Sequence, residues 1–162
     1  MTKILIIYAT VGGNTELVVE KITQILNSQK AEKNLELQII SKRVDLGNPN
    51  EILENDLTIL ASPTYGQGTV ESHFLPFIKQ MNKMDLTNSK LAVIGLGSPR
   101  FYPEYLTEAA GILEMEVKKS NGNLIVPSLR IGGEVLKMLD KLVPNWTNKL
   151  LTKLMESAGN IS

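Results

Sequence analysis

The sequence predicts an α/β fold in which a parallel sheet is covered by helices on both faces. Short apolar runs recur at residues 4–8, 35–40, 57–61, 91–94 and 124–126, most of them without polar alternation, as is typical of strands buried on both faces. Segments with helical spacing of apolar residues separate these runs. Strands that alternate with helices pair in parallel through right-handed crossovers. With 162 residues, the chain is expected to form one domain over residues 1–162.

The connecting segments differ in how clearly they indicate helices. After the first strand, the helical spacing of Val18, Ile22 and Leu26 predicts an amphipathic helix, and a similar spacing recurs over residues 74–81. The second crossover is polar and rich in turn formers over residues 41–49, which leaves room for only a short helix around 51–54. The last segment, residues 134–155, has helical spacing that Pro144 should break or kink.

Composition excludes several classes of function. The chain has no Cys and one His, which excludes disulfides, thiol nucleophiles and Cys/His zinc sites, so redox chemistry would need a bound cofactor. Lys plus Arg and Asp plus Glu number 17 each, so no basic surface for nucleic acid is indicated. Apolar runs are too short for a secretory signal or a membrane span. We therefore expect a cytoplasmic protein.

The turn after the first strand has the composition of a phosphate site. In an open parallel sheet, ligands bind beyond the carboxyl ends of the strands. Here residues 9–15 offer the hydroxyls of Thr10 and Thr15, the Asn14 amide and the N-terminus of a helix. The nearest cations in sequence are Lys3 and Lys21, which favours a monophosphate over a nucleoside triphosphate. The alternative interpretation is an ordinary capped turn.

Aromatic residues gather in the two other loops at that edge, residues 62–68 and 95–105. The chain has only one Trp, four Tyr and three Phe, yet Tyr65, Phe101, Tyr102 and Tyr105 lie in these loops. Two such loops could hold a flat heteroaromatic ligand between them, although the rings could instead fold back onto the core. A dinucleotide-binding fingerprint is excluded because Arg100 replaces its third glycine.

These residues resemble the signature of the flavodoxin family, small proteins that bind FMN without a covalent bond. The N-terminal pattern is matched by Ile6, Ile7, Tyr8, Thr10, Gly13, Thr15, Val19 and Ile22. The resemblance covers essentially the whole chain and is closest to the short-chain type. It implies a flavodoxin-like three-layer fold with a five-stranded sheet in the order 2-1-3-4-5.

The resemblance also implies a function and a set of FMN contacts. It implies a low-potential carrier that shuttles single electrons between redox partner proteins, a reductase and an acceptor enzyme, as a monomer without a metal or a catalytic residue. Tyr65 and either Phe101 or Tyr102, with Tyr102 favoured, would stack on the flavin, and Gly66 would be the turn that responds to its redox state. The residues expected to contact FMN are Thr10, Val11, Gly12, Gly13, Asn14, Thr15, Ser62, Pro63, Thr64, Tyr65, Gly66, Gln67, Gly95, Leu96, Gly97, Phe101, Tyr102 and Tyr105.

Some positions depart from the family pattern. Gly12 replaces a hydroxyl residue common in the first turn, Gln67 replaces an Asp, and Ser98 and Pro99 alter the fourth-strand loop. Two alternatives therefore stay open. One is an FMN-dependent NAD(P)H quinone or azo reductase of the same fold, and the other is a binding module that has lost the flavin.

Overall fold

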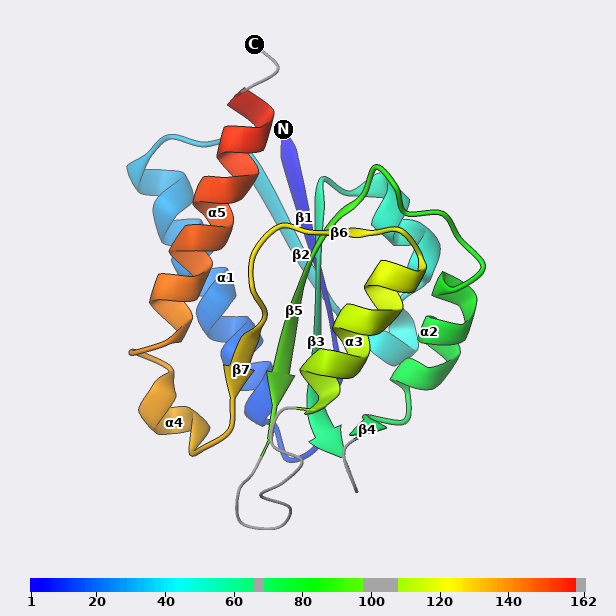
Figure 1. Cartoon of the computed structure of the whole chain (residues 1–162). Helices are drawn as coiled ribbons and strands as arrows, with labels where there is room; N and C mark the ends of the chain where they lie inside the picture. The colour runs from blue at the N-terminus through cyan, green and yellow to red at the C-terminus, as the bar shows by residue number, and fades with distance from the viewer. Residues whose placement is uncertain (66–68, 98–107, 160–162) are drawn as a thin grey trace.

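The computed structural model describes residues 1–65, 69–97 and 108–159 (Figure 1). Helices and strands alternate along most of this chain. In order, the elements are β1 (Thr2–Tyr8), α1 (Asn14–Glu32), β2 (Leu37–Arg43), the 3₁₀ helices η1 (Val44–Leu46) and η2 (Pro49–Glu54), β3 (Leu57–Tyr65), β4 (Thr69–Val70), α2 (Phe74–Met81), β5 (Lys90–Leu96), α3 (Glu108–Lys119), β6 (Asn123–Leu124), β7 (Leu129–Ile131), α4 (Val135–Met138) and α5 (Val143–Gly159).

The sheet confirms the predicted parallel order. Its strands run β2-β1-β3-β5-β6, all parallel, while β7 continues beside β5 and β4 pairs antiparallel with the end of β3. The predicted fifth strand is split into β6 and β7, because residues 125–128 bulge out opposite only two residues of β5. Pro127 in this bulge has no N–H to give to a ladder, and its carbonyl accepts a hydrogen bond from Trp146 Nε1 at 2.8 Å.

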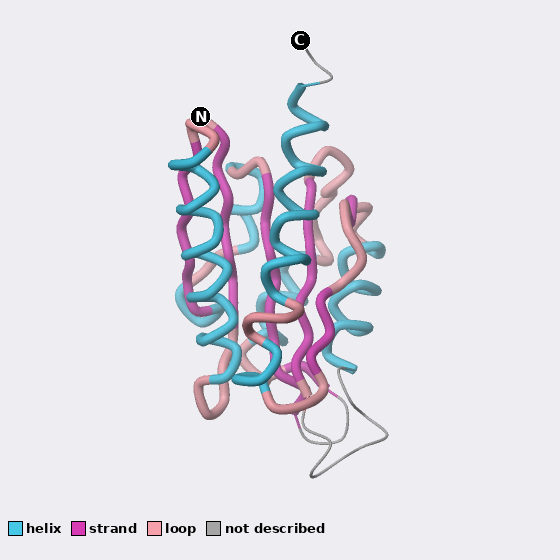
Figure 2. Tube along the Cα trace, turned by 90° about the vertical axis from the view of Figure 1, so that its left-hand side faces the viewer, coloured by secondary structure: helices cyan, strands magenta, loops and turns pink. Residues whose placement is uncertain are grey.

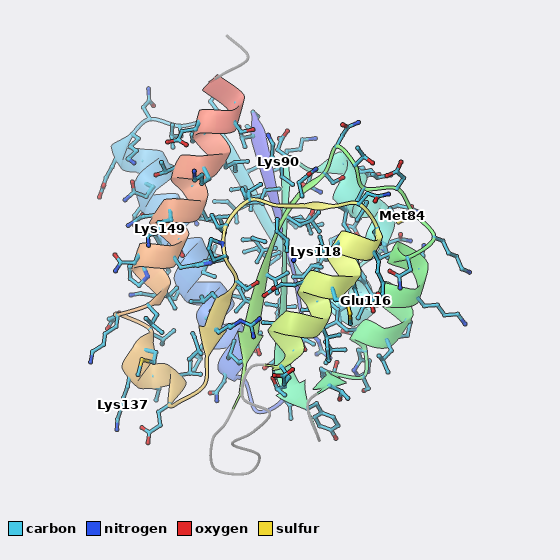
Figure 3. All side chains as sticks on the ribbon, in the orientation of Figure 1. Met84, Lys90, Glu116, Lys118, Lys137 and Lys149 are labelled. Carbon is cyan, nitrogen blue, oxygen red and sulfur yellow. The ribbon has the colours of Figure 1, made fainter. Side chains whose placement is uncertain are left out.

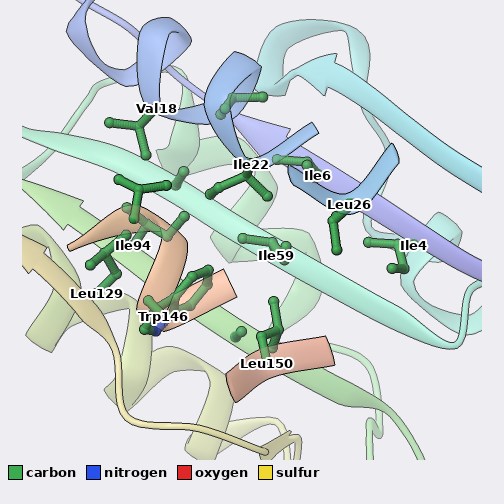
Figure 4. Close-up of a cluster of buried hydrophobic side chains, with 14 of the residues drawn as sticks. Ile4, Ile6, Val18, Ile22, Leu26, Ile59, Ile94, Leu129, Trp146 and Leu150 are labelled. Atoms are coloured by element: carbon green, nitrogen blue, oxygen red, sulfur yellow. The ribbon is translucent and has the colours of Figure 1, made fainter. Parts of the chain in front are cut away.

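Helices cover both faces of the sheet, as expected. Figure 1 shows α1 and α5 on one side of the sheet and α2 and α3 on the other, and Figure 2 shows α1 and α5 side by side over the strands. The face under α1 and α5 carries a large apolar cluster. In Figure 4, Ile59 of β3 lies between Ile22 of α1 and Leu150 of α5, and all three side chains are fully buried. Trp146 of α5 is a buried member of the same cluster.

The second crossover and the last segment differ in detail from the predictions. β2 continues to Arg43, and η2 is a 3₁₀ helix that begins with a capping box between Asn48 and Glu51. The last segment is interrupted before Val143, so Pro144 lies in the first turn of α5 and does not kink it. Proline is tolerated there because the first-turn N–H groups have no intrahelical acceptor. None of the described helices is both long enough and apolar enough to cross a bilayer.

α3 is held in place at both ends. At its start, Ala109 N donates to Thr64 Oγ1 of β3 at 3.1 Å. Near its end, the buried Glu116 carboxylate accepts a hydrogen bond from Asn82 Nδ2 at 2.7 Å, and Figure 3 shows Glu116 on the side of α3 that faces α2. The position of α3 over the sheet is therefore fixed by polar contacts as well as by apolar packing.

One buried hydroxyl group is expected to lower the free energy of unfolding. Thr58 in β3 has no exposed surface, and its Oγ1 has no hydrogen-bond partner among the described residues. Replacing Thr58 with valine keeps the shape and removes the unsatisfied group, so we expect the free energy of unfolding to rise by about 1 kcal/mol in urea titrations. Thr147 is the matched control, because it is equally buried but donates to Val143 O at 2.7 Å. Thr147→Val should lower stability or leave it unchanged, and equal effects of the two substitutions would contradict the explanation.

Candidate functional site

The carboxyl ends of β1, β3 and β5 lie side by side at one edge of the sheet. In the strand register, Tyr8 is opposite Ala61, and Ser62 is opposite Gly95. The turn into α1 and the ends of β3 and β5 therefore lie at the same edge, at the bottom of Figure 1. This is the arrangement that the sequence predicted for the three candidate loops.

Two glycines shape the turn between β1 and α1. Gly12 and Gly13 have φ angles of 78° and 87°, a region that residues with a Cβ rarely adopt. Gly13 is the N-cap of α1, and its carbonyl accepts the first helical hydrogen bond, from Leu17 N at 3.1 Å. No side chain caps the helix. The first-turn N–H groups, beginning at Asn14, have no acceptor within the helix.

Two threonine hydroxyls in the same turn also lack partners. Oγ1 of Thr10 and Oγ1 of Thr15 are both buried, and neither has a hydrogen-bond partner among the described residues. Thr15 is only 1% exposed. Within the described residues, the turn therefore combines uncapped backbone donors with two unsatisfied hydroxyls. A phosphate monoester supplies three acceptor oxygens and the negative charge that the helix N-terminus favours, so these residues fit such a group.

Charged residues lie close to this turn, although none lies within it. The register places Arg43, the last residue of β2, beside Tyr8. Glu16 is in the first turn of α1. Burial raises the pKa of the Tyr8 hydroxyl, the Glu16 carboxylate raises it further, and Arg43 counteracts part of this effect. Sequence analysis missed Arg43, since only the pairing register of two strands reveals that it lies near the turn.

The end of β3 is built on side-chain hydrogen bonds. Ser62 is fully buried, and its hydroxyl donates to Pro63 O at 2.8 Å and accepts from Glu71 N at 3.0 Å. Thr64 Oγ1 accepts from α3, as described above. Ser62 and Thr64 thus hold this segment in position, and contact with a ligand would come from their backbone. Tyr65 is 52% exposed, unusually open for an aromatic ring.

At the end of β5, backbone groups rather than side chains are available to contact a ligand. Leu96 is buried in the core, and Gly97 N donates to Ile131 O at 2.9 Å. At Gly95, a Cβ would lie 2.5 Å from Ala110 Cβ, so only glycine lets α3 approach β5 this closely. The other predicted contact residues, Gly66, Gln67, Phe101, Tyr102 and Tyr105, lie outside the described residues.

A buried carboxylate follows β4, beside the candidate site. Glu71 is 7% exposed and accepts hydrogen bonds from His73 N at 2.9 Å and from Ser72 Oγ at 3.1 Å, while His73 Nδ1 lies 2.8 Å from Glu71 Oε1. Burial alone would raise the pKa of Glu71, but the bonds from His73 and Ser72 outweigh it and lower the pKa below its ordinary value. His73 is the N-cap residue of α2.

Because the pKa of Glu71 is lowered in the folded protein, the free energy of unfolding depends on pH. The stabilisation from this carboxylate is complete above the unfolded pKa, near 4.5, and is lost as the pH falls through the lower folded value. Glu71→Gln should therefore lose less stability than the wild type between about pH 4.5 and pH 3, as measured by urea midpoints. The Glu32→Gln variant, at an exposed position of α1, is the control for the change in charge. If the urea midpoints of Glu71→Gln and the wild type fell equally between about pH 4.5 and pH 3, this explanation would be wrong.

No group of three or more His, Asp or Glu side chains in the described ranges could hold a metal ion. Among the described residues, the edge combines a turn that fits a phosphate with the exposed ring of Tyr65 and the glycine-containing end of β5. This combination suits a phosphorylated aromatic cofactor.

Comparison with known proteins places the chain in a family. The flavodoxin family model matches residues 6–146. A probable flavodoxin 2 of Bacillus subtilis is 29% identical over 131 residues, which cover 81% of this chain and 82% of the relative. A flavodoxin of Maridesulfovibrio salexigens is 26% identical over 156 residues, which cover 95% of this chain and the whole of the relative.

Solved structures agree with the sequence matches. Oxidised flavodoxin 2 of Bacillus cereus superposes with a TM-score of 0.80 at 26% identity, covering 94% of this chain and 99% of that one. A Fusobacterium nucleatum flavodoxin bound to flavin mononucleotide has the same fold, with a TM-score of 0.77 at 20% identity and the same coverage. Because the family model covers most of the sequence and the fold agrees, this chain belongs to the flavodoxin family.

Proposed function

We propose that this protein binds FMN at the carboxyl edge of its sheet and carries electrons between redox partner proteins. The observation that carries the proposal is the pair of buried hydroxyls of Thr10 and Thr15 at the uncapped N-terminus of α1, which have no partner in the described part of the chain. A phosphate satisfies these donors without a cation. Membership of the flavodoxin family supports FMN as the cofactor and electron transfer as the activity.

In this proposal the residues of the chain bind and orient the cofactor. The turn over residues 10–15 holds the phosphate, and the segments that end β3 and β5 flank the flavin ring, with Tyr65 as one stacking partner. Bound FMN supplies the redox chemistry, since it accepts and releases electrons one at a time. Gly66, Gln67, Leu96, Gly97, Phe101, Tyr102 and Tyr105 complete the proposed contacts. We also propose a cytoplasmic monomer that exchanges electrons with a reductase and an acceptor enzyme.

Titration of the apoprotein with FMN tests the proposal. FMN fluorescence should be quenched to a saturating end point at one equivalent, and FMN should bind more tightly than riboflavin, which lacks the phosphate. Absence of saturable FMN uptake would overturn the proposal and favour a flavin-less module. The holoprotein should not oxidise NAD(P)H in the presence of a quinone until a reductase is added. Turnover without a reductase would instead identify a quinone or azo reductase.

A further inference from the structure

The phosphate turn contains no cation, but a cation approaches it from the neighbouring strand. β2 pairs in parallel with β1 over its whole length, and its last residue, Arg43, lies directly beside Tyr8. Tyr8 is only two residues before Thr10, the first hydroxyl of the turn. Neighbouring strands are about 4.8 Å apart, so the backbone of Arg43 lies close to the base of the turn.

The side chain of Arg43 extends on the same face of the sheet as α1. Side chains alternate between faces along a strand, and Leu37 and Ile39 of β2 pack in the cluster beneath α1 and α5. Arg43 shares their parity, so it belongs to this face. Its side chain is 58% exposed, and its Nε lies 3.3 Å from Asp45 Oδ1, so the positive charge of the guanidinium is only partly neutralised. The helix that it approaches is the one whose N-terminus would hold the phosphate.

A carboxylate with the opposite effect lies in the first turn of α1. Glu16 is exposed, and it follows the buried hydroxyl residue Thr15 directly. Without a ligand, its negative charge favours the positive end of the helix dipole. With a dianionic phosphate bound at that end, the same charge repels the ligand. The two side chains therefore act on the same phosphate with opposite signs.

We propose that Arg43 and Glu16 together set how strongly this protein prefers a phosphorylated flavin to an unphosphorylated one. Arg43 attracts the phosphate from the end of β2, and Glu16 opposes it from the first turn of α1. The inference rests on the proposed function, because it concerns the affinity of that same phosphate site. It adds a specificity-determining cation that lies 28 residues beyond the turn in sequence.

Lys42 offers a matched control for Arg43. It is the neighbouring residue of β2, it carries the same charge, and its side chain is on the opposite face, where Nζ lies 2.8 Å from Glu51 Oε2. A unit charge about 10 Å from a dianion in water changes a binding constant roughly three- to fivefold at low salt. We therefore expect Arg43→Gln to weaken FMN binding about three- to fivefold. Lys42→Gln should change it less than Arg43→Gln does, about twofold at most, since its charge lies farther from the turn and is paired more closely with a carboxylate.

Calorimetric or fluorescence titration of each apoprotein with FMN and with riboflavin, at low and high salt, tests this inference. Glu16→Gln should tighten FMN binding about two- to fivefold, and Arg43→Gln should weaken it, while riboflavin affinity stays the same in all variants. Both FMN effects should shrink below about twofold at 0.5 M salt. If Arg43→Gln and Lys42→Gln bind FMN equally, or if riboflavin responds as FMN does, the inference is overturned while the proposed function stands. Failure of the wild type to take up FMN would instead reject the proposed function itself.

Discussion

Replacing Thr15 with valine should have opposite effects on the apoprotein and on the FMN complex. Thr15 is 1% exposed, and its hydroxyl has no partner among the described residues. Removing an unsatisfied buried hydroxyl should raise the free energy of unfolding of the apoprotein by about 1 kcal/mol. If that hydroxyl donates to the phosphate, the same substitution removes a hydrogen bond to a charged group, about 1.5–3 kcal/mol. FMN affinity should then fall roughly 10- to 100-fold.

The opposite effects on apoprotein stability and on FMN affinity distinguish a ligand-binding role of Thr15 from a purely structural role. A purely structural threonine would lose stability and affinity together, whereas a ligand-binding threonine loses only affinity. Thr15→Ser keeps the hydroxyl and should bind FMN within a few-fold of the wild type. Urea unfolding of the apoproteins and FMN titration provide the two readouts. Wild-type FMN affinity in Thr15→Val would show that this hydroxyl does not contact the phosphate.

Local features of the fold could be predicted from the sequence. The apolar runs gave the strand positions because strands buried on both faces carry few polar residues. The helix after β1 followed from its spacing of Val18, Ile22 and Leu26, and the glycines of the preceding turn do adopt the positive φ angles that glycine allows. The order of the strands came from the family resemblance, since apolar patterning does not determine which strands are neighbours.

Features that depend on contacts between distant residues could not be predicted. The apolar residues 125 and 126 indicate a strand, but the chain bulges there, and Trp146 Nε1 donates to Pro127 O in the same segment. Arg43 lies beside Tyr8 only through the register of β1 and β2. In each case, a partner far along the chain determines the role of the residue.

The close approach of α3 to β5 predicts a second large effect. Gly95 lies in the middle of the sheet, opposite Ser62 on β3 and Arg130 on β7. A Cβ there would lie 2.5 Å from Ala110 Cβ, 2.6 Å from Ala110 N and 2.9 Å from Ala110 Cα. Two of these three atoms are backbone, so no side-chain rotation relieves the overlap. Gly95→Ala should therefore destabilise the protein by about 1–3 kcal/mol, the usual result of overpacking.

The same substitution should also weaken FMN binding, because it would displace α3 from its position over the sheet, and the start of α3 is bonded to the end of β3. Moving its first turn strains the bond from Ala109 N to Thr64 Oγ1, which holds the end of β3. Gly111 is the matched control on α3, since a Cβ there meets nothing closer than Arg130 Nη2 at 3.8 Å. Gly111→Ala should raise stability by about 0.5–1 kcal/mol through helix propensity and leave FMN binding unchanged. Urea unfolding and FMN titration of both variants measure this contrast, and a Gly95→Ala protein as stable as Gly111→Ala would mean that the sheet and α3 can separate without cost.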